Sequence, residues 1–172
     1  EANLESQYTW FYRDNENLTG LDKANGQRLR AIPELALPMR ALWGFSRPSV
    51  SLDYTRYELD DYTLGDAGFD RTVPVFEWDN GLYFDRRSSL FDVPYNQTLE
   101  PRLYYAWADA EADQNHIPDF DTGIRSFRFD QLFRRDRFTG GDRVGDANQL
   151  TVALTSRFND LLTGAERARV SI

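Results

Sequence analysis

Apolar and polar residues alternate along most of this chain, and this alternation restricts its fold more than any other sequence feature. In the stretch NQTLEPRLYYAWA, residues 96–108, Leu103 and Trp107 fall on one side of an extended chain. Glu100 and Arg102 fall on the other side. Since successive side chains of a strand point to opposite faces, this period of two predicts a β-strand with one apolar and one polar face.

Six further runs show a similar alternation. With the first, they cover approximately residues 4–14, 27–37, 48–59, 72–86, 96–108, 148–160 and 165–172. The third run changes phase near Arg56, which predicts a β-bulge. Gly81, inside the fourth run, predicts a bend or a close approach of another group to the backbone. Helical spacing is approached only around residues 126–138, and glycines soon follow it, so we predict an all-β, antiparallel chain.

The connectors between these runs alternate in length, as they do in a transmembrane barrel. Residues 109–147 form a very long connector, whereas the connectors over 87–95 and 160–164 are short. The connector over 38–47 is of moderate length and fits the alternation least well. Outer-membrane barrels join long outer loops with short periplasmic turns. We therefore predict that residues 1–172 are a partial barrel domain, about seven strands of a larger antiparallel barrel, with an extracellular loop at about 109–147.

Composition leaves other classes of protein open. The aromatic content of 15% suits the aromatic girdles of a barrel, and it also suits a soluble β-sandwich in which four tryptophans stack on sugars. Either that carbohydrate-binding or hydrolytic sandwich or another outer-membrane channel or receptor would show the same alternation. The net charge of −8 argues against a nucleic-acid partner, whose binding surface should be basic. With no cysteine, the chain offers no disulfide and no thiolate metal site.

Catalytic groups are scarce. Asp119 and Asp121 form the most suggestive carboxylate pair, but nothing in their surroundings indicates the defined separation that acid–base work needs. His116 is the only histidine, which argues against a nucleophilic triad or a multi-histidine metal site. We therefore expect no enzymatic activity, no metal and no cofactor.

Several long ordered strings resemble one known family. They are TVPVFEWDNGLYFDR, QTLEPRLYYAWA, the stretch from IPDFDTG to ALTSRF, and TGAERARVSI. They are similar to the barrel region of the LptD family, the lipopolysaccharide-assembly proteins of Gram-negative outer membranes. The resemblance implies that this chain is a middle segment of a longer protein, whose large barrel follows a periplasmic jelly-roll. It also implies an outer-membrane location and transfer of lipopolysaccharide from a periplasmic Lpt bridge to the outer leaflet, with the lipoprotein LptE as a plug inside the barrel.

The alternation and this resemblance together assign residues to surfaces. The residues expected to face membrane lipid are Phe76, Trp78, Leu103, Tyr105, Trp107, Leu150, Val152 and Leu154. Those expected to face the lumen are Glu100, Arg102, Tyr104, Thr151, Thr155 and Arg157. Within the long loop, the residues expected to contact the plug lipoprotein or the lumen are Phe129, Gln131, Phe133, Arg137, Asp142 and Arg143. The aromatic and arginine side chains among them are typical anchors of a protein interface.

Overall fold

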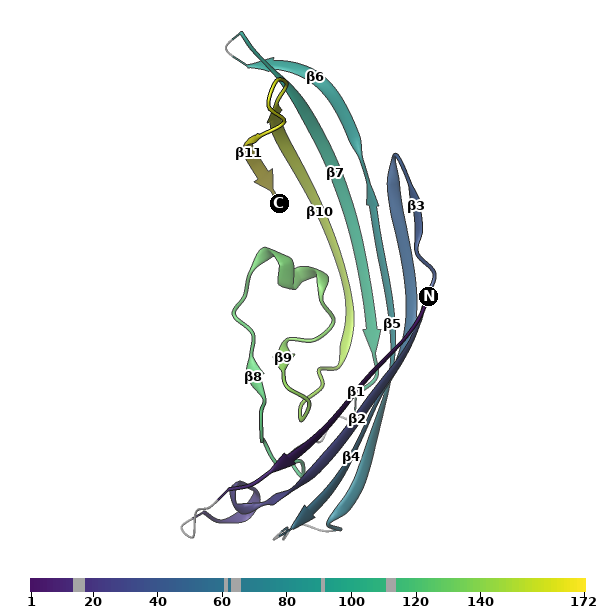
Figure 1. Ribbon diagram of the computed structural model, residues 1–172, viewed down its shortest axis with the longest axis vertical. Coiled ribbons are helices and arrows are strands. Elements are labelled where there is room, and N and C mark those ends of the chain that lie inside the picture. Colours follow the sequence, from purple (N-terminus) through teal and green to yellow (C-terminus); the bar gives the residue numbers. More distant parts are fainter. Residues whose placement is uncertain (14–17, 61, 63–65, 91, 111–113) are drawn as a thin grey trace.

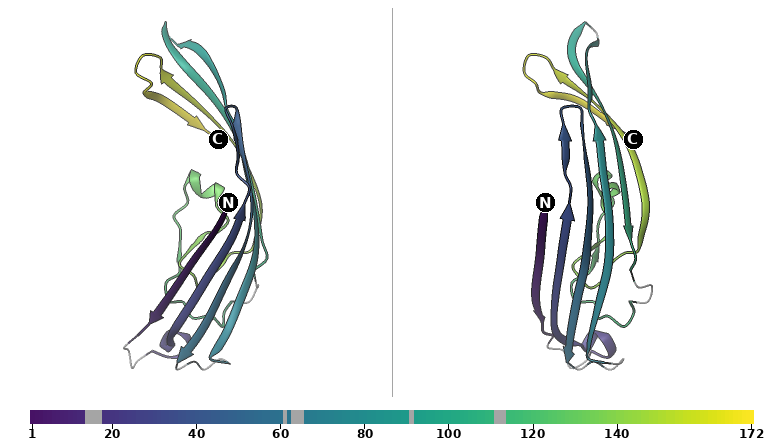
Figure 2. Two further views of the ribbon diagram at one scale, coloured as in Figure 1. Left: turned by 45° about the vertical axis from the view of Figure 1, so that its right-hand side comes forward. Right: turned by 90° about the vertical axis from the view of Figure 1, so that its right-hand side faces the viewer.

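One antiparallel sheet makes up most of the computed structural model, and a long loop lies against its concave face (Figures 1 and 2). The structure describes residues 1–13, 18–60, 62, 66–90, 92–110 and 114–172. The sheet is open, because its first and last strands pair with no other described residues on their outer edges. No helix among the described residues is long and apolar enough to cross a membrane.

Seven strands form the continuous path of the sheet, and they match the seven predicted runs. In spatial order they are β1 (Ala2–Phe11), β2 (Asn25–Ala36), β4 (Gly44–Asp60), β5 (Gly68–Leu82), β7 (Val93–Ala108), β10 (Ala147–Asp160) and β11 (Glu166–Ser171). Each pairs antiparallel with its neighbours. The predicted antiparallel, all-β fold is confirmed.

Two shorter strands extend this path. β3 (Met39–Ala41) continues β2 against β4, and β6 (Phe84–Leu90) continues β5 against β7, each in the register of the strand before it. The moderate connector predicted over 38–47 is therefore wrong. Pairing extends to Ala41 and Gly44, so that only Leu42 and Trp43 make the turn. Short turns thus lie at one end of the sheet, and the longer connectors lie at the other (Figure 1). Residues 61 and 63–65, between β4 and β5, lie outside the described residues.

The long loop carries little regular structure of its own. It contains the 3-10 turn η2 (Phe129–Phe133) and a two-stranded ribbon of β8 (Gly123–Ile124) and β9 (Phe138–Thr139). A second 3-10 turn, η1 (Gly20–Lys23), lies between β1 and β2. The loop therefore depends on contacts with the sheet for its position.

The predicted bulge near Arg56 is wrong. β4 keeps one register against both neighbours, and Arg56 stands opposite Leu29 on β2 and Asp70 on β5. The phase changes for a different reason. Towards the end of β4 the loop covers the concave face, so the apolar residues Tyr57 and Leu59 lie on that side and are buried.

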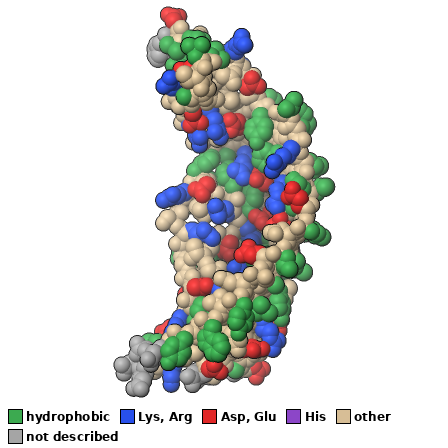
Figure 3. Space-filling model, viewed as in Figure 1, with side chains coloured by type: hydrophobic (Ala, Val, Ile, Leu, Met, Phe, Trp, Pro, Cys, Tyr) green, Lys and Arg blue, Asp and Glu red, His purple; other side chains and the backbone are tan. Residues whose placement is uncertain are grey.

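Burial is inverted relative to a soluble sheet, as large apolar side chains are exposed on the convex face. We call the apolar side chains of this face the convex belt; Phe76 and Tyr105 are half-buried in it, and its exposed members are Leu35, Val50, Leu52, Trp78, Leu103, Trp107, Leu150, Val152 and Leu154. Leu150 and Val152 are 62% and 69% exposed. On the concave face, by contrast, Arg28 and Asp53 are fully buried. Figure 3 shows charged side chains gathered in the hollow and hydrophobic ones along the convex edge.

Gly81 provides the close approach that the sequence indicates. It pairs with Phe45 across β4 and β5, and the Phe45 ring lies where a Cβ atom at position 81 would be. An alanine at this position must displace the ring or bend the strand. Gly68, at the start of β5, is a matched control, because a Cβ there would meet only the Tyr57 carbonyl oxygen at 3.9 Å.

We predict that Gly81→Ala destabilises the folded protein by about 1–3 kcal/mol, the usual effect of overpacking, whereas Gly68→Ala has a smaller effect. Thermal unfolding in detergent measures the difference. In a Phe45→Ala background the effect of Gly81→Ala should shrink, and an unchanged effect would mean that the ring is not the cause.

Candidate functional site on the concave face

Asp142 is the centre of the contacts between the long loop and the sheet. Its Oδ1 accepts a bond from Arg28 Nη1 at 2.7 Å and another from the Tyr57 hydroxyl at 3.0 Å. Its Oδ2 accepts the backbone N–H groups of Phe120 and Asp121 at 2.8 and 2.9 Å. Asp142, Arg28 and Tyr57 are all fully buried. The carboxylate therefore ties together two strands and two segments of the loop.

Two further groups complete this network. The Asp121 carboxylate accepts hydrogen bonds from both terminal nitrogens of Arg28, at 2.7 and 2.8 Å. Arg71, on β5, donates to the carbonyl oxygens of Asp142 and Gly141 at 2.6 and 2.8 Å. We call the set Arg28, Tyr57, Arg71, Asp121 and Asp142 the loop clasp. Because a buried charge is tolerated only when it is paired and hydrogen-bonded, the fully buried Arg28 and Asp142 each require the other.

Glycines allow the loop to come this close. Gly140 has φ of +73°, a left-handed conformation that favours glycine. A Cβ at Gly141 would come within 2.8 Å of the Arg28 guanidinium carbon. The sequence Gly140-Gly141-Asp142 thus presents backbone and carboxylate to two arginines without steric obstruction.

The Arg28 guanidinium holds the pKa of the Asp121 carboxyl well below its usual value by hydrogen bonding to it. A lowered folded-state pKa means that the charged carboxylate favours folding at every pH above its unfolded-state pKa of about 3.9. That contribution decreases only as the pH falls below this value. The clasp therefore stays closed across the neutral and mildly acidic range.

Aromatic packing supports the clasp. The rings of Phe11 and Phe120 stack with centroids 4.2 Å apart, joining β1 to the loop. Ile117 is buried against Tyr57 and Leu59 of β4. The loop therefore contacts the sheet through an apolar layer as well as through charges.

The middle of the loop has a second attachment, farther along the concave face. The Arg102 guanidinium lies 3.9 Å from the centre of the Phe133 ring, and the Tyr104 ring lies edge-on to the same phenyl group. The Thr151 hydroxyl donates to the Leu132 carbonyl oxygen at 2.7 Å. These contacts hold η2 over β7 and β10.

The residues predicted to lie on the two surfaces of the sheet are on the predicted sides. All eight residues expected to face lipid lie on the convex face, and all six expected to face the lumen lie on the concave face. Whether these faces meet lipid and a water-filled lumen stays a prediction.

The predicted plug-contact residues are divided between two environments. Asp142 is fully buried in the clasp, so its carboxylate is already occupied within the chain. Arg143 donates to the Gln114 carbonyl oxygen, and Phe133 packs on Arg102. Phe129 and Arg137 remain exposed, and Gln131 is half-buried. Among the described residues, no group of Asp, Glu and His side chains forms a metal-binding cluster.

Sequence reasoning missed Arg28, Tyr57 and Arg71. Each lies in a strand more than 70 positions from Asp142 along the chain, so spacing could not bring them together. One local signal exists. Arg28 and Arg71 each lie on the polar side of an alternating strand pattern, and the loop covers that side of the sheet.

Comparison with known proteins then identifies the family. The family model described as LPS transport system D matches residues 1–172, the whole chain. The chain belongs to the LptD family. LPS-assembly protein LptD of Marinobacter nauticus is 98% identical over all of this chain, which corresponds to 22% of that protein.

More distant LptD proteins also match. The LPS-assembly protein of Hahella chejuensis is 51% identical over 98% of the chain, and that of Azoarcus sp. is 44% identical over 99%. The chain spans about a fifth of the length of the curated relatives it matches. The names of the family and of these relatives describe transport and assembly of lipopolysaccharide, which is not an enzymatic activity.

We predict that Asp142→Asn releases the loop, because removing one partner of a buried ion pair costs about 3–5 kcal/mol. Hydrogen exchange should quicken about a hundredfold or more at the amides of Phe120, Asp121 and Gly141, with little change in β7. The control is Asp130→Asn, since the exposed Asp130 carboxylate accepts a hydrogen bond from its neighbour Gln131 and lies outside the clasp. Equal exchange in the two variants would contradict the role of the clasp.

Proposed function

We propose that this chain forms part of the wall of an outer-membrane β-barrel that assembles lipopolysaccharide into the outer leaflet. The convex belt carries the proposal, because it places exposed apolar side chains over adjacent strands while charged residues are buried on the other face. A sheet in lipid needs this arrangement, whereas in water it would expose a large apolar patch.

The open edges of the sheet support the same proposal. Unpaired backbone groups are not tolerated in hydrocarbon, so β1 and β11 need further strands beside them. The matched region of the relatives is about a fifth of their length, which leaves ample chain for those strands.

The soluble sandwich that the sequence left open predicts a second layer over the apolar face. The described residues provide no such layer, and the loop covers the opposite face (Figure 2). Membership of the LptD family also disfavours an unrelated channel or receptor.

We further propose that the long loop caps the lumen and contacts the plug lipoprotein LptE. Its middle part, residues 123–139, contains five arginines and two aspartates, a net charge of +3. Phe127 is 80% exposed there, and Phe129 is 40% exposed. Exposed aromatic and arginine side chains on an anchored loop suit an interface with an acidic partner surface.

We predict that Val152→Arg lowers the amount of folded protein in the outer membrane. Val152 is opposite Leu103, near the middle of the convex belt, where an arginine costs about 2–4 kcal/mol in lipid. Val93→Arg is the matched control, because Val93 lies at the turn end of β7, where the cost falls to about 0–1 kcal/mol. Heat-modifiable mobility of membrane fractions measures folding. If both variants assemble equally well, the convex face does not meet lipid.

We also predict that a photo-crosslinking residue at Phe129, Gln131 or Arg137 captures LptE in cells. The control position is Leu150, which is exposed on the convex face and should not capture it. Capture at Leu150 alone, or at none of the three loop positions, would exclude the loop as the docking element.

A further inference from the structure

A pocket on the concave face lies outside the loop clasp, between η2 and the turn end of the sheet. Its cavity volume is about 380 Å³. It draws its walls from β4, β5, β7, β10, β11 and the loop, and the docked loop closes one side of it. Small-molecule sites in proteins have volumes of about 300–1,000 Å³.

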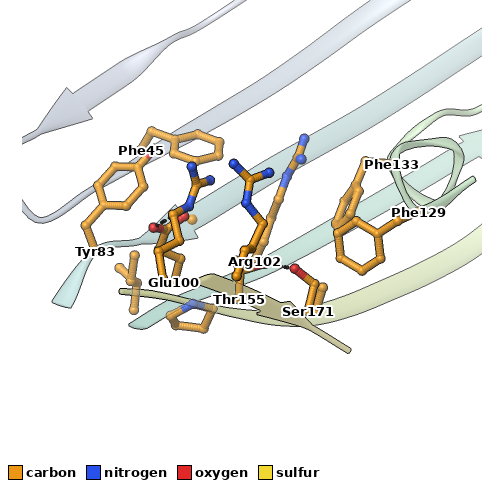
Figure 4. Close-up of a pocket in the computed structure, with 14 residues that line it drawn as sticks. Phe45, Tyr83, Glu100, Arg102, Phe129, Phe133, Thr155 and Ser171 are labelled. Carbon is orange, nitrogen blue, oxygen red and sulfur yellow. Dashed lines mark hydrogen bonds and ion pairs between the residues drawn. The ribbon is translucent and has the colours of Figure 1, made fainter. Parts of the chain in front are cut away.

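Two aromatic pairs stand at opposite ends of this pocket (Figure 4). Phe45 and Tyr83 form one pair, with ring centroids 6.1 Å apart, and Phe129 and Phe133 form the other at 5.6 Å. Tyr83 is 47% exposed and Phe129 is 40% exposed, so each pair offers ring surface to the cavity. Flat apolar surfaces at both ends suit a ligand with flat, C–H-rich faces.

Charged side chains line the middle of the pocket, and each is already paired. Arg102 binds Asp79 through Nε and Nη2 at 2.8 and 2.7 Å. Arg157 lies 3.0 Å from Glu100, and Arg169 binds Glu166 through two nitrogens at 2.9 and 3.0 Å. Since every guanidinium has its own carboxylate, the pocket lacks the unpaired positive charge that would favour a phosphate.

Hydrogen-bonding capacity nevertheless remains. Nη1 of Arg102 and Nη1 of Arg169 donate to no other group within the described ranges. The hydroxyls of Thr155 and Ser171 bond each other at 2.9 Å and can each accept another bond. A ligand that both donates and accepts, and that carries no charge, matches these groups.

We propose that this pocket binds a neutral sugar unit of the saccharide part of lipopolysaccharide. Pyranose rings have C–H-rich faces that pack on aromatic rings, and their hydroxyls both donate to carboxylates and accept from guanidinium groups. That the sugar belongs to lipopolysaccharide rests on the proposed function, whereas the fit of the pocket to a neutral sugar does not.

The test measures binding of oligosaccharide to the full-length protein in complex with its lipoprotein, in detergent. The probe is the oligosaccharide released from lipopolysaccharide by mild acid and then dephosphorylated, and saturation-transfer NMR and calorimetry give the affinity. Tyr83→Ala and Phe129→Ala should each weaken binding about threefold to tenfold, the range expected for loss of one aromatic contact. Tyr12→Ala is the control, because Tyr12 is exposed just beyond the end of β1 and does not line the pocket.

The outcomes separate this proposal from the others. Binding of the dephosphorylated probe that is weakened by the two pocket variants and unaffected by the control supports the proposal. Equal binding of a maltose oligosaccharide with the same variant pattern supports it as a general neutral-sugar site. No binding, binding of only the phosphorylated probe, or equal loss in Tyr12→Ala overturns it. Normal lipopolysaccharide assembly in cells alongside any of these results would leave the proposed function standing and reject the pocket alone.

Discussion

A single desolvated ion pair, between Arg28 of β2 and Asp142 of the long loop, determines how the concave side of this sheet is built. Burying either charge alone would be strongly unfavourable, so the pair forms only when the loop and strand are both in place. The other hydrogen bonds of the Asp142 carboxylate come from Tyr57 and from loop amides, which explains why β4 and residues 120–121 are fixed by the same contact. The register of β2 against β4 and the path of the loop are therefore coupled.

In the proposed setting the convex face of the sheet meets lipid and the concave face meets the lumen, and this difference accounts for the inverted burial. Polar side chains that a soluble protein would expose are instead covered by the loop, where they pair with one another. Asp53 shows the principle: it is fully buried, paired with Arg30, and approached by Arg135 of the loop at 3.7 Å. In the proposed setting, apolar side chains such as Val152 face hydrocarbon, so that they contribute to stability only in the membrane.

Local periodicity was enough to predict the strands, because a period of two is a property of each strand alone. The same reasoning failed where distant chain segments decide the environment. Tyr57 and Leu59 looked out of phase because the loop that buries them is about 60–85 residues away in sequence. The length of the turn at Leu42 and Trp43 was overestimated, because the residues on either side of it pair although their sequence has no strong strand pattern. The loop clasp depends on contacts between the sheet and the loop across 71 to 114 positions, and no spacing rule encodes those.

The ribbon of β8 and β9 lies directly beyond the clasp, and it joins Gly123 to Thr139. Closing the loop at this neck separates the clasp residues from the stretch 125–137, in which Leu132, Phe133 and Arg135 make their own contacts with the sheet. Since the entropic cost of closing a flexible loop rises only slowly with its length, residues could be inserted between the neck and these contacts with little effect on the clasp. The rest of the tip can thus change its length and chemistry to suit a different neighbour while the wall beneath it stays the same.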